Sequence, residues 1–346
     1  MGIIQTPFVH GQHDMGVTES KSSWGYWTHF VCGFVLVLLW RFQQHQLEGH
    51  WESPKRAIER EIADDITVVE SIDSDEDDEG GKQEESLISE KAKLELHGLV
   101  PSSTSAECAR FVKASRTDIR RAKDKLEAYL KWHQEHALFE KSLEFNGEPR
   151  TDEDEWILAS QVAIIACNEK SGVSLDRIAG IYCDNIGTPI RDFEGHRILH
   201  VMPGRVDAKI AHPNTYALAL ALFINKKLDR SSSEKITVVI DVRGRKGWPN
   251  IHPCRQLPFI KAITGLLLAM FPERLHRCLL LPVPASAMWI WNLCSVWIDP
   301  LTVAKINLLE GEARIFSPAP FKEMEVFMSP KIALMLECRR NEGINE

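Results

Sequence analysis

The stretch Phe271–Ile306, "FPERLHRCLLLPVPASAMWIWNLCSVWIDPLTVAKI", decides the fold. Its first part predicts the end of a helix and then a buried strand. The segment that follows contains three tryptophans and no charged residue until Asp299. A helix that is apolar nearly all round lies in a protein core, in a membrane or against an apolar ligand. The rest of the chain has to decide among these three environments.

Strand and helix patterns alternate on both sides of this stretch. The run "KITVVIDVRG" is rich in β-branched residues, as expected of a strand buried on both faces. Helices are predicted to begin near Pro213 and to cover "LPFIKAITGLLLAMF". Further strands are predicted at "HRILHVM", "RCLLLPV" and "KINLLE". The order strand, helix, strand, helix, strand indicates parallel crossovers and an α/β sheet.

A helical unit is predicted before the alternating region. Thr104 and Glu107 have the spacing of a capping box, in which each residue bonds an exposed backbone N–H group of the other. The following sequence "TDIRRAKDKLEAYLKWHQEH" has a helical apolar face. Another helix is predicted over residues 152–169. The apolar face of the "TDIRRAKDKLEAYLKWHQEH" helix consists of Ile119, Ala122, Leu126 and Leu130.

Composition and charge exclude several classes of protein. The 346 residues are 44% hydrophobic and 26% charged, which is ordinary for one large or two smaller globular domains. The net charge is −8, but residues 64–79 contribute nine acids and no base, so the remainder is near neutral. This distribution gives no support for nucleic-acid binding. The eight cysteines form no CxxC pair, which favours reduced thiols in a cytosolic compartment.

Two N-terminal segments differ from the rest of the chain. Trp24–Trp40 has no formally charged residue and has aromatic residues at both ends, as in a single-pass membrane anchor. A helix of this length spans about 25 Å, slightly less than the hydrocarbon layer, so a helix packed on the folded domain is the alternative. Residues 52–91 are acidic and too polar to order themselves. They are predicted to form a tether through which a protein partner could dock.

Four motifs in the expected order resemble the CRAL-TRIO family. They are "RFVKASRTDIRRAKDKLEAYLKWH", "DFEGHRILHV", "ITVVIDVRG" and the opening stretch, with its Pro-Glu-Arg turn and Asp-Pro-x-Thr-x-x-Lys ending. The resemblance covers residues 105–311 and implies a CRAL-TRIO-like α/β fold, with a mostly parallel sheet floor, flanking helices and an N-terminal helical unit. We expect a disordered start 1–23, an apolar segment 24–42, an acidic disordered linker 43–91, a helical unit 92–150, the lipid-binding domain 151–311 and a C-terminal tail 312–346.

The resemblance also implies the role of the tryptophan-rich segment. It would be a gate helix over an apolar cavity that holds one lipid, with a bound phospholipid as the ligand and no cofactor. Two acyl chains hold about 30 methylenes, and burying each methylene away from water is favourable by about 0.8 kcal/mol. The wall of the cavity therefore has to be apolar. The gate and cavity residues implied are Trp289, Ile290, Leu293, Val296 and Trp297.

Polar residues in the same motifs imply a headgroup site. In family members that bind phosphatidylinositol, the headgroup is held by residues that match Glu273 and Lys305 here. A Glu–Lys ion pair without a ligand is the alternative. A third family contact, an arginine, matches Ser115, and Arg116 is adjacent to it. The expected headgroup residues are therefore Glu273, Lys305 and Arg116.

The sequence therefore predicts a non-enzymatic protein that binds one phosphatidylinositol-like phospholipid and transfers or presents it between membranes. Its partners would be phospholipid and a membrane surface, at the cytoplasmic face of a membrane or in the cytoplasm. One alternative is a ligandless, membrane-associated scaffold for a protein such as a small GTPase. Another is a nucleotide-binding α/β enzyme, for which only the weak Gly244-x-x-Gly247 turn speaks. His196 and His200 form a pair without a third metal ligand, which indicates a structural role.

Overall fold

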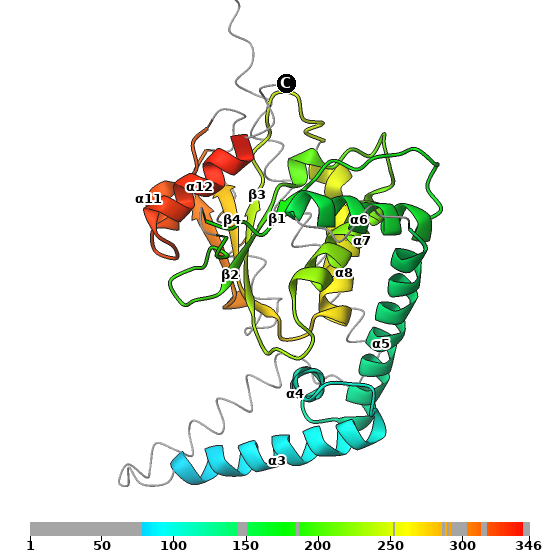
Figure 1. Cartoon of the computed structure of the whole chain (residues 1–346). Coiled ribbons are helices and arrows are strands. Elements are labelled where there is room, and N and C mark those ends of the chain that lie inside the picture. Colours follow the sequence, from blue (N-terminus) through cyan, green and yellow to red (C-terminus); the bar gives the residue numbers. More distant parts are fainter. Residues whose placement is uncertain are drawn as a thin grey trace, which may run out of the picture.

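The computed structural model describes residues 78–143, 151–184, 187–251, 253–285, 303–312 and 317–341, together with Met288 and Trp291. This part of the chain forms a central sheet with helices on both of its faces and a helical unit that extends from one end (Figure 1). None of the helices in the described ranges is long and apolar enough to cross a membrane. The predicted anchor Trp24–Trp40 lies outside the described residues.

The sheet has five strands in the order β1-β2-β3-β4-β5, with β3 at its centre. β1 is antiparallel to β2, and the other neighbours are parallel, so the predicted mostly parallel α/β sheet is confirmed. On β3, Val239 lies opposite His200 of β2 and Leu279 of β4. The strands are β1 (Ala179–Gly180), β2 (Arg197–Val201), β3 (Ile236–Asp241), β4 (Leu275–Val283) and β5 (Ile306–Glu310).

The two faces of the sheet contribute to two separate apolar cores. Side chains alternate along a strand, so Val238 joins one core and Val239 joins the other. α6 (Asp152–Ala166), α7 (Pro213–Lys227) and α8 (Pro253–Met270) belong to the larger core (Figure 1). α11 (Phe321–Met324) and α12 (Pro330–Asn341) cover the other face, so part of the predicted C-terminal tail packs on the sheet.

The N-terminal helical unit consists of α3 (Asp78–Leu99), α4 (Ser105–Ala114) and α5 (Ile119–Ser142). The capping box of Thr104 and Glu107 is present at the start of α4, as predicted. On α5, Ala122 and Leu126 of the predicted apolar face are fully buried.

The disordered linker predicted over residues 43–91 is wrong for its last part, because α3 begins at Asp78. The composition of α3 is polar at its start, but its second half buries Ala92 and Leu96 in the core that α4 and α5 share. This packing provides the apolar contact that orders the helix, which the composition of the linker alone does not reveal.

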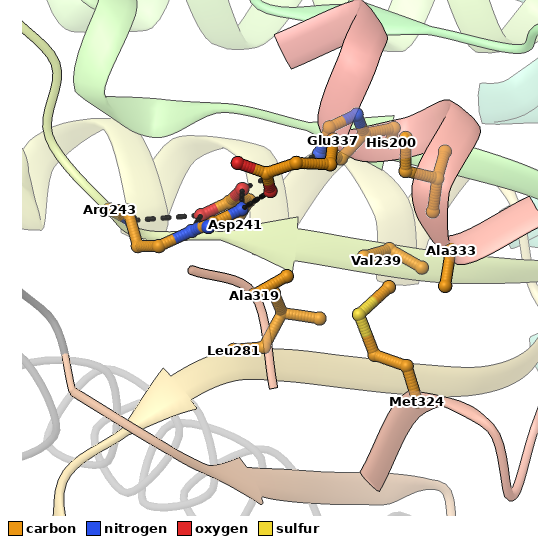
Figure 2. Close-up of a pocket in the computed structure, with 10 residues that line it drawn as sticks. His200, Val239, Asp241, Arg243, Leu281, Ala319, Met324, Ala333 and Glu337 are labelled. Atoms are coloured by element: carbon orange, nitrogen blue, oxygen red, sulfur yellow. Dashed lines mark hydrogen bonds and ion pairs between the residues drawn. The ribbon is translucent and has the colours of Figure 1, made fainter. Parts of the chain in front are cut away.

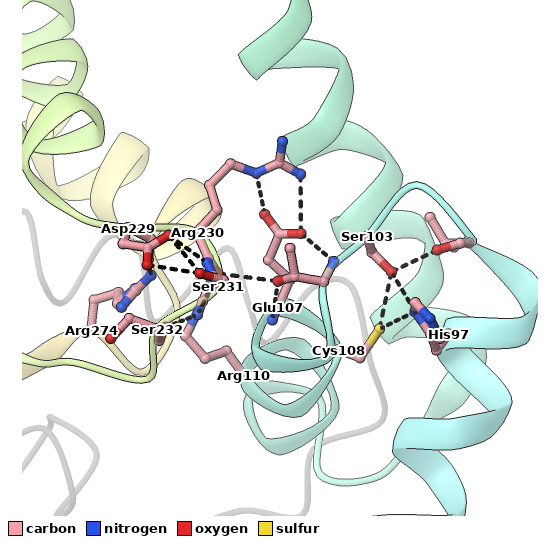
Figure 3. Close-up of polar contacts among 12 residues, drawn as sticks. His97, Ser103, Glu107, Cys108, Arg110, Asp229, Arg230, Ser231, Ser232 and Arg274 are labelled. Atoms are coloured by element: carbon pink, nitrogen blue, oxygen red, sulfur yellow. Dashed lines mark hydrogen bonds and ion pairs between the residues drawn. The ribbon is translucent and has the colours of Figure 1, made fainter.

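An ion pair between the buried Glu107 and the partly exposed Arg230 joins the helical unit to the sheet domain (Figure 3). Glu107 of α4 is fully buried and accepts two bonds from Arg230, at 2.6 and 3.1 Å, and one from the backbone N–H of Thr104. Arg110 donates to the carbonyl of Ser232 at 2.7 Å in the same loop after α7. Burial by itself would raise the pKa of Glu107, but the bonds from Arg230 and Thr104 outweigh it and the pKa is lowered.

We expect Glu107→Gln to lower the free energy of unfolding by about 1.5–3 kcal/mol, the usual range for a hydrogen bond to a charged group. Because the pKa of Glu107 is lowered in the folded state, its stabilisation is present above the unfolded value near 4.5 and disappears as the pH falls through the folded value. Thermal unfolding at several pH values should therefore show a difference between wild type and variant that shrinks on acidification.

Glu90→Gln provides the matched control, since Glu90 forms an exposed pair with Lys93 on α3. Such a surface pair contributes at most about 1 kcal/mol. Equal effects of the two substitutions, or a difference for Glu107→Gln that does not depend on pH, would contradict the role assigned to the buried pair.

Candidate functional site

The sheet face toward α8 keeps apolar side chains that are only partly buried. On β3, Ile240 packs at the edge of the larger core and is partly exposed, whereas Val239 on the opposite face is 1% exposed. β5 shows the same difference, because Ile306 and Leu308 are partly exposed and Leu309 on the other face is buried. This incompletely covered apolar surface lies on the face where the predicted cavity would be.

Most of the predicted gate segment cannot be compared with the structure. Trp289, Ile290, Leu293, Val296 and Trp297 lie outside the described residues. Two neighbours of this group are described. Trp291 is buried in the larger core, and Met288 packs against that core. The start of the segment therefore lies on the same side of the sheet as the partly covered apolar surface.

The topology brings two of the predicted headgroup residues to one edge of the sheet. Glu273 stands two residues before β4, and Lys305 stands directly before β5. β4 and β5 are parallel neighbours, and the Cys278 N–H donates to the Lys305 carbonyl at 2.7 Å. Both residues therefore lie where these strands begin.

The third predicted residue, Arg116, follows the end of α4 in an exposed turn with a φ of 51°. Its helix reaches the same edge, since Lys113 Nζ of α4 lies 3.5 Å from Glu273 Oε2. The alternative pairing of Glu273 with Lys305 is not among the ion pairs of the described residues, where Glu273 has Lys113 as its partner.

The backbone around Glu273 is constrained. Its φ is 60°, in the left-handed region that non-glycine residues adopt at a cost and that is frequent at functional sites. The next residue, Arg274, is buried and donates to the carbonyls of Glu234 and Asp229, at 2.8 and 2.5 Å. Burial lowers the pKa of Arg274 to about 10, so it still carries its charge at neutral pH. These bonds hold the Pro-Glu-Arg turn in place.

The opposite face of the sheet contains a small pocket with a charged wall (Figure 2). Its charged lining residues are Asp241, Arg243 and Glu337, and together with the adjacent Arg340 we call them the Asp241 cluster. Arg243 donates to both oxygens of Asp241, at 2.9 and 2.6 Å, and to Glu337 at 2.6 Å. Arg340 Nε lies 3.2 Å from Asp241. The free space of about 10 Å³ holds roughly one water molecule, so this pocket is too small for a lipid.

The Asp241 cluster fastens α12 to the end of β3. Burial by itself would raise the pKa of Asp241, but the nearby His200 and the bonds from Arg243 hold this pKa well below its usual range. Asp241 therefore remains a carboxylate bound between two guanidinium groups, which does not suit it to act as a general base. Sequence reasoning missed this cluster, because the only local signal was Asp241-x-Arg243 after a buried strand.

Two sequence features are candidates for metal or nucleotide chemistry, the His196–His200 pair and the Gly244-x-x-Gly247 turn. They do not form one site. His200 Nε2 lies 3.9 Å from Asp241, whereas His196 stacks on His276 of β4. The Gly244-x-x-Gly247 turn directs the Gly244 carbonyl toward Arg340, at 2.5 Å. A phosphate-binding loop would instead present N–H donors, so this contact does not support the nucleotide-binding alternative.

A mostly parallel sheet with one partly covered apolar face, preceded by a helical unit, defines an α/β binding domain for an apolar ligand. Residues 185–329 match the family model of the CRAL/TRIO domain. The match includes β2 to β5, Glu273 and Lys305, and it confirms the resemblance found in the motifs.

Among solved structures, the crystal structure of Sfh5 is similar to this chain, with a TM-score of 0.42 and 17% sequence identity. The similarity covers 65% of this chain and 80% of the Sfh5 chain.

We expect Asp241→Asn to lower the free energy of unfolding by about 3–5 kcal/mol, because removing one partner of a buried ion pair leaves buried charges uncompensated. Chemical denaturation followed by circular dichroism measures this change. Glu323→Gln on α11 is the control, since Glu323 is exposed. If Asp241→Asn lowered the free energy of unfolding no more than the control does, the cluster would not be what holds α12 on the sheet.

Proposed function

We propose that residues 92–346 bind one phosphatidylinositol-like phospholipid on the α8 side of the sheet and transfer or present it between membranes without catalysis. The observation that carries the proposal is the row of partly exposed apolar side chains on this face, Ile240, Val242, Ile306 and Leu308. The family match supports an apolar ligand. The choice of phospholipid and the transfer activity are our inference.

The energetics favour this face for the acyl chains. Two chains of about 30 methylenes need on the order of 20 kcal/mol of compensating apolar contact. The pocket on the opposite face has a charged wall and space for about one water molecule. The α8 face offers apolar residues from the strands, and α8 adds Leu266, Leu267 and Met270 to the same core.

The positions of the polar residues suggest how the lipid would be oriented. Leu308 follows Lys305 by three residues, about 10 Å along the strand, and Ile240 lies at the same level, since both flank Leu280 of β4. A headgroup at the edge where β4 and β5 begin would allow the acyl chains to run along the strands. Lys305 offers a point charge to a phosphate, and Glu273 accepts hydrogen bonds from hydroxyl groups.

Ile240→Trp tests the location of the acyl chains. If the apolar face lines a cavity, the larger side chain fills it and reduces lipid transfer between vesicles at least tenfold, with little change in the melting temperature. If the face is packed, the substitution overfills the core and costs about 1–3 kcal/mol. The measurements are transfer of a fluorescent phosphatidylinositol and thermal unfolding of the same samples.

Val326→Trp is the matched control, since Val326 is an exposed apolar residue beyond α11. It should change neither transfer nor stability. The location proposed for the acyl chains would be wrong if Ile240→Trp retained full transfer activity. Wild-type transfer no faster than that of a heat-denatured sample, across several lipid classes, would refute the transfer function itself.

Lys305→Ala tests the headgroup site. Loss of one charge-assisted bond costs about 1.5–3 kcal/mol, which corresponds to about 10–150-fold weaker binding of phosphatidylinositol. Binding of an uncharged lipid such as diacylglycerol should be unchanged. Lys322→Ala on α11 removes an exposed charge on the other side of the sheet and serves as the control. Equal losses for both lipids with a lower melting temperature would indicate a structural role for Lys305 instead.

A further inference from the structure

We propose that Asp192, His196 and His276, with Glu194 at the rim, form a site for one divalent zinc ion, which we call the His196–His276 cluster. Asp192, Glu194 and His196 belong to the turn that precedes β2, and His276 is the second residue of β4. Nitrogen and oxygen ligands of this kind suit zinc. The cluster includes Thr237 of β3 as a hydrogen-bond partner and lies on the sheet face opposite Ile240.

The distances bring three ligand atoms close together and place Glu194 beside one of them. The ligand atoms of Asp192, His196 and His276 all lie within 4.8 Å of one another. Asp192 Oδ1 is 3.5 Å from His196 Nδ1, and Glu194 Oε2 is 3.0 Å from His276 Nε2. Zinc bonds of about 2.0–2.2 Å place tetrahedral ligands about 3.3–3.6 Å apart. Because the two imidazole rings are stacked nearly parallel, one ring would have to tilt so that both nitrogen lone pairs reach the same ion.

Two nitrogen atoms in the cluster are buried without a hydrogen bond. They are His196 Nδ1 and His276 Nε2, which also are the atoms closest to the carboxylates. The Glu194 oxygen near His276 does not have the direction needed for a hydrogen bond. A buried polar atom without a partner is unfavourable and calls for an explanation. A metal ion would accept the lone pairs of both nitrogens at once.

The surrounding groups orient the carboxylates as supporting residues do at metal sites. Asp192 Oδ1 accepts the backbone N–H groups of Glu194 and His196, at 3.0 and 2.8 Å. Asp192 Oδ2 accepts the hydroxyl of Thr237 at 2.5 Å. Arg277 binds the other oxygen of Glu194, Oε1, at 2.7 Å, so Oε2 stays directed toward His276.

The fold supplies the third ligand that the sequence lacked. His196 and His200 are four residues apart, but they do not share a site, because His200 Nε2 lies near Asp241, at 3.9 Å. Across β3, His276 stacks on His196 with 3.7 Å between ring centroids and 12° between planes. His196 directly precedes β2 and His276 belongs to β4, the two strands on either side of β3. A zinc ion would therefore fasten the turn before β2 to the start of β4.

The experiment uses the full chain after treatment with a chelator and dialysis. Titration with Co²⁺, followed by its visible absorption, should show one four-coordinate ion for each chain. Added Zn²⁺ should displace it and raise the melting temperature with increasing concentration, as expected for a ligand that binds the folded state. His196→Gln and His276→Gln should abolish both signals, and Glu194→Gln should weaken Co²⁺ binding at least tenfold.

His212→Asn is the matched control, because His212 is an exposed histidine at the start of α7 and asparagine preserves its capping role. It should bind Co²⁺ like the wild type. Circular dichroism verifies that each variant is folded, and the partly exposed Glu194 provides a variant that does not disturb the core. The site would be refuted if wild type showed neither signal, or if Glu194→Gln and the histidine variants bound Co²⁺ as tightly as the control.

Discussion

The ion pair between Asp241 and Arg243 is the contact on which the arrangement of the sheet domain depends. It lies at the end of the central strand β3, and both side chains are almost fully buried. Together with Glu337 and Arg340 it binds α12 to one face of the sheet. Since side chains alternate along a strand, Ile240 faces the other way. One face is therefore closed by charges and a helix, and the other is the face that we propose for the apolar ligand.

A second ion pair, between Glu107 and Arg230, holds the N-terminal helical unit on the sheet domain. Glu107 and Arg230 join α4 to the loop after α7 (Figure 3). Lys113 of the same helix reaches Glu273. Buried ion pairs add little net stability compared with apolar packing, but removing one partner is costly. Their effect is to favour one docking of the helical unit, and that docking brings Lys113 to the Glu273 turn before β4.

The local features of this fold could be predicted from the sequence, and the long-range ones could not. The run "ITVVID" and the capping box at Thr104 carry their own patterns, and both proved correct. The bond from Arg243 to Glu337 joins residues 94 positions apart, and His196 meets His276 only because β2 and β4 flank β3. No spacing in the sequence encodes such encounters. α3 was missed for a related reason, since its order depends on burying Ala92 and Leu96 against other helices.

The same edge of the sheet carries the proposed headgroup residues and the proposed zinc ligands. Glu273 lies three residues before His276, and Arg277 after it binds Glu194. The left-handed backbone of Glu273 needs support from its surroundings, and the bonds of Arg274 provide part of it. A zinc ion on His276 would restrain the first residues of β4 from the opposite face. Metal binding would then order the turn that presents Glu273, although the ion and the lipid would never touch.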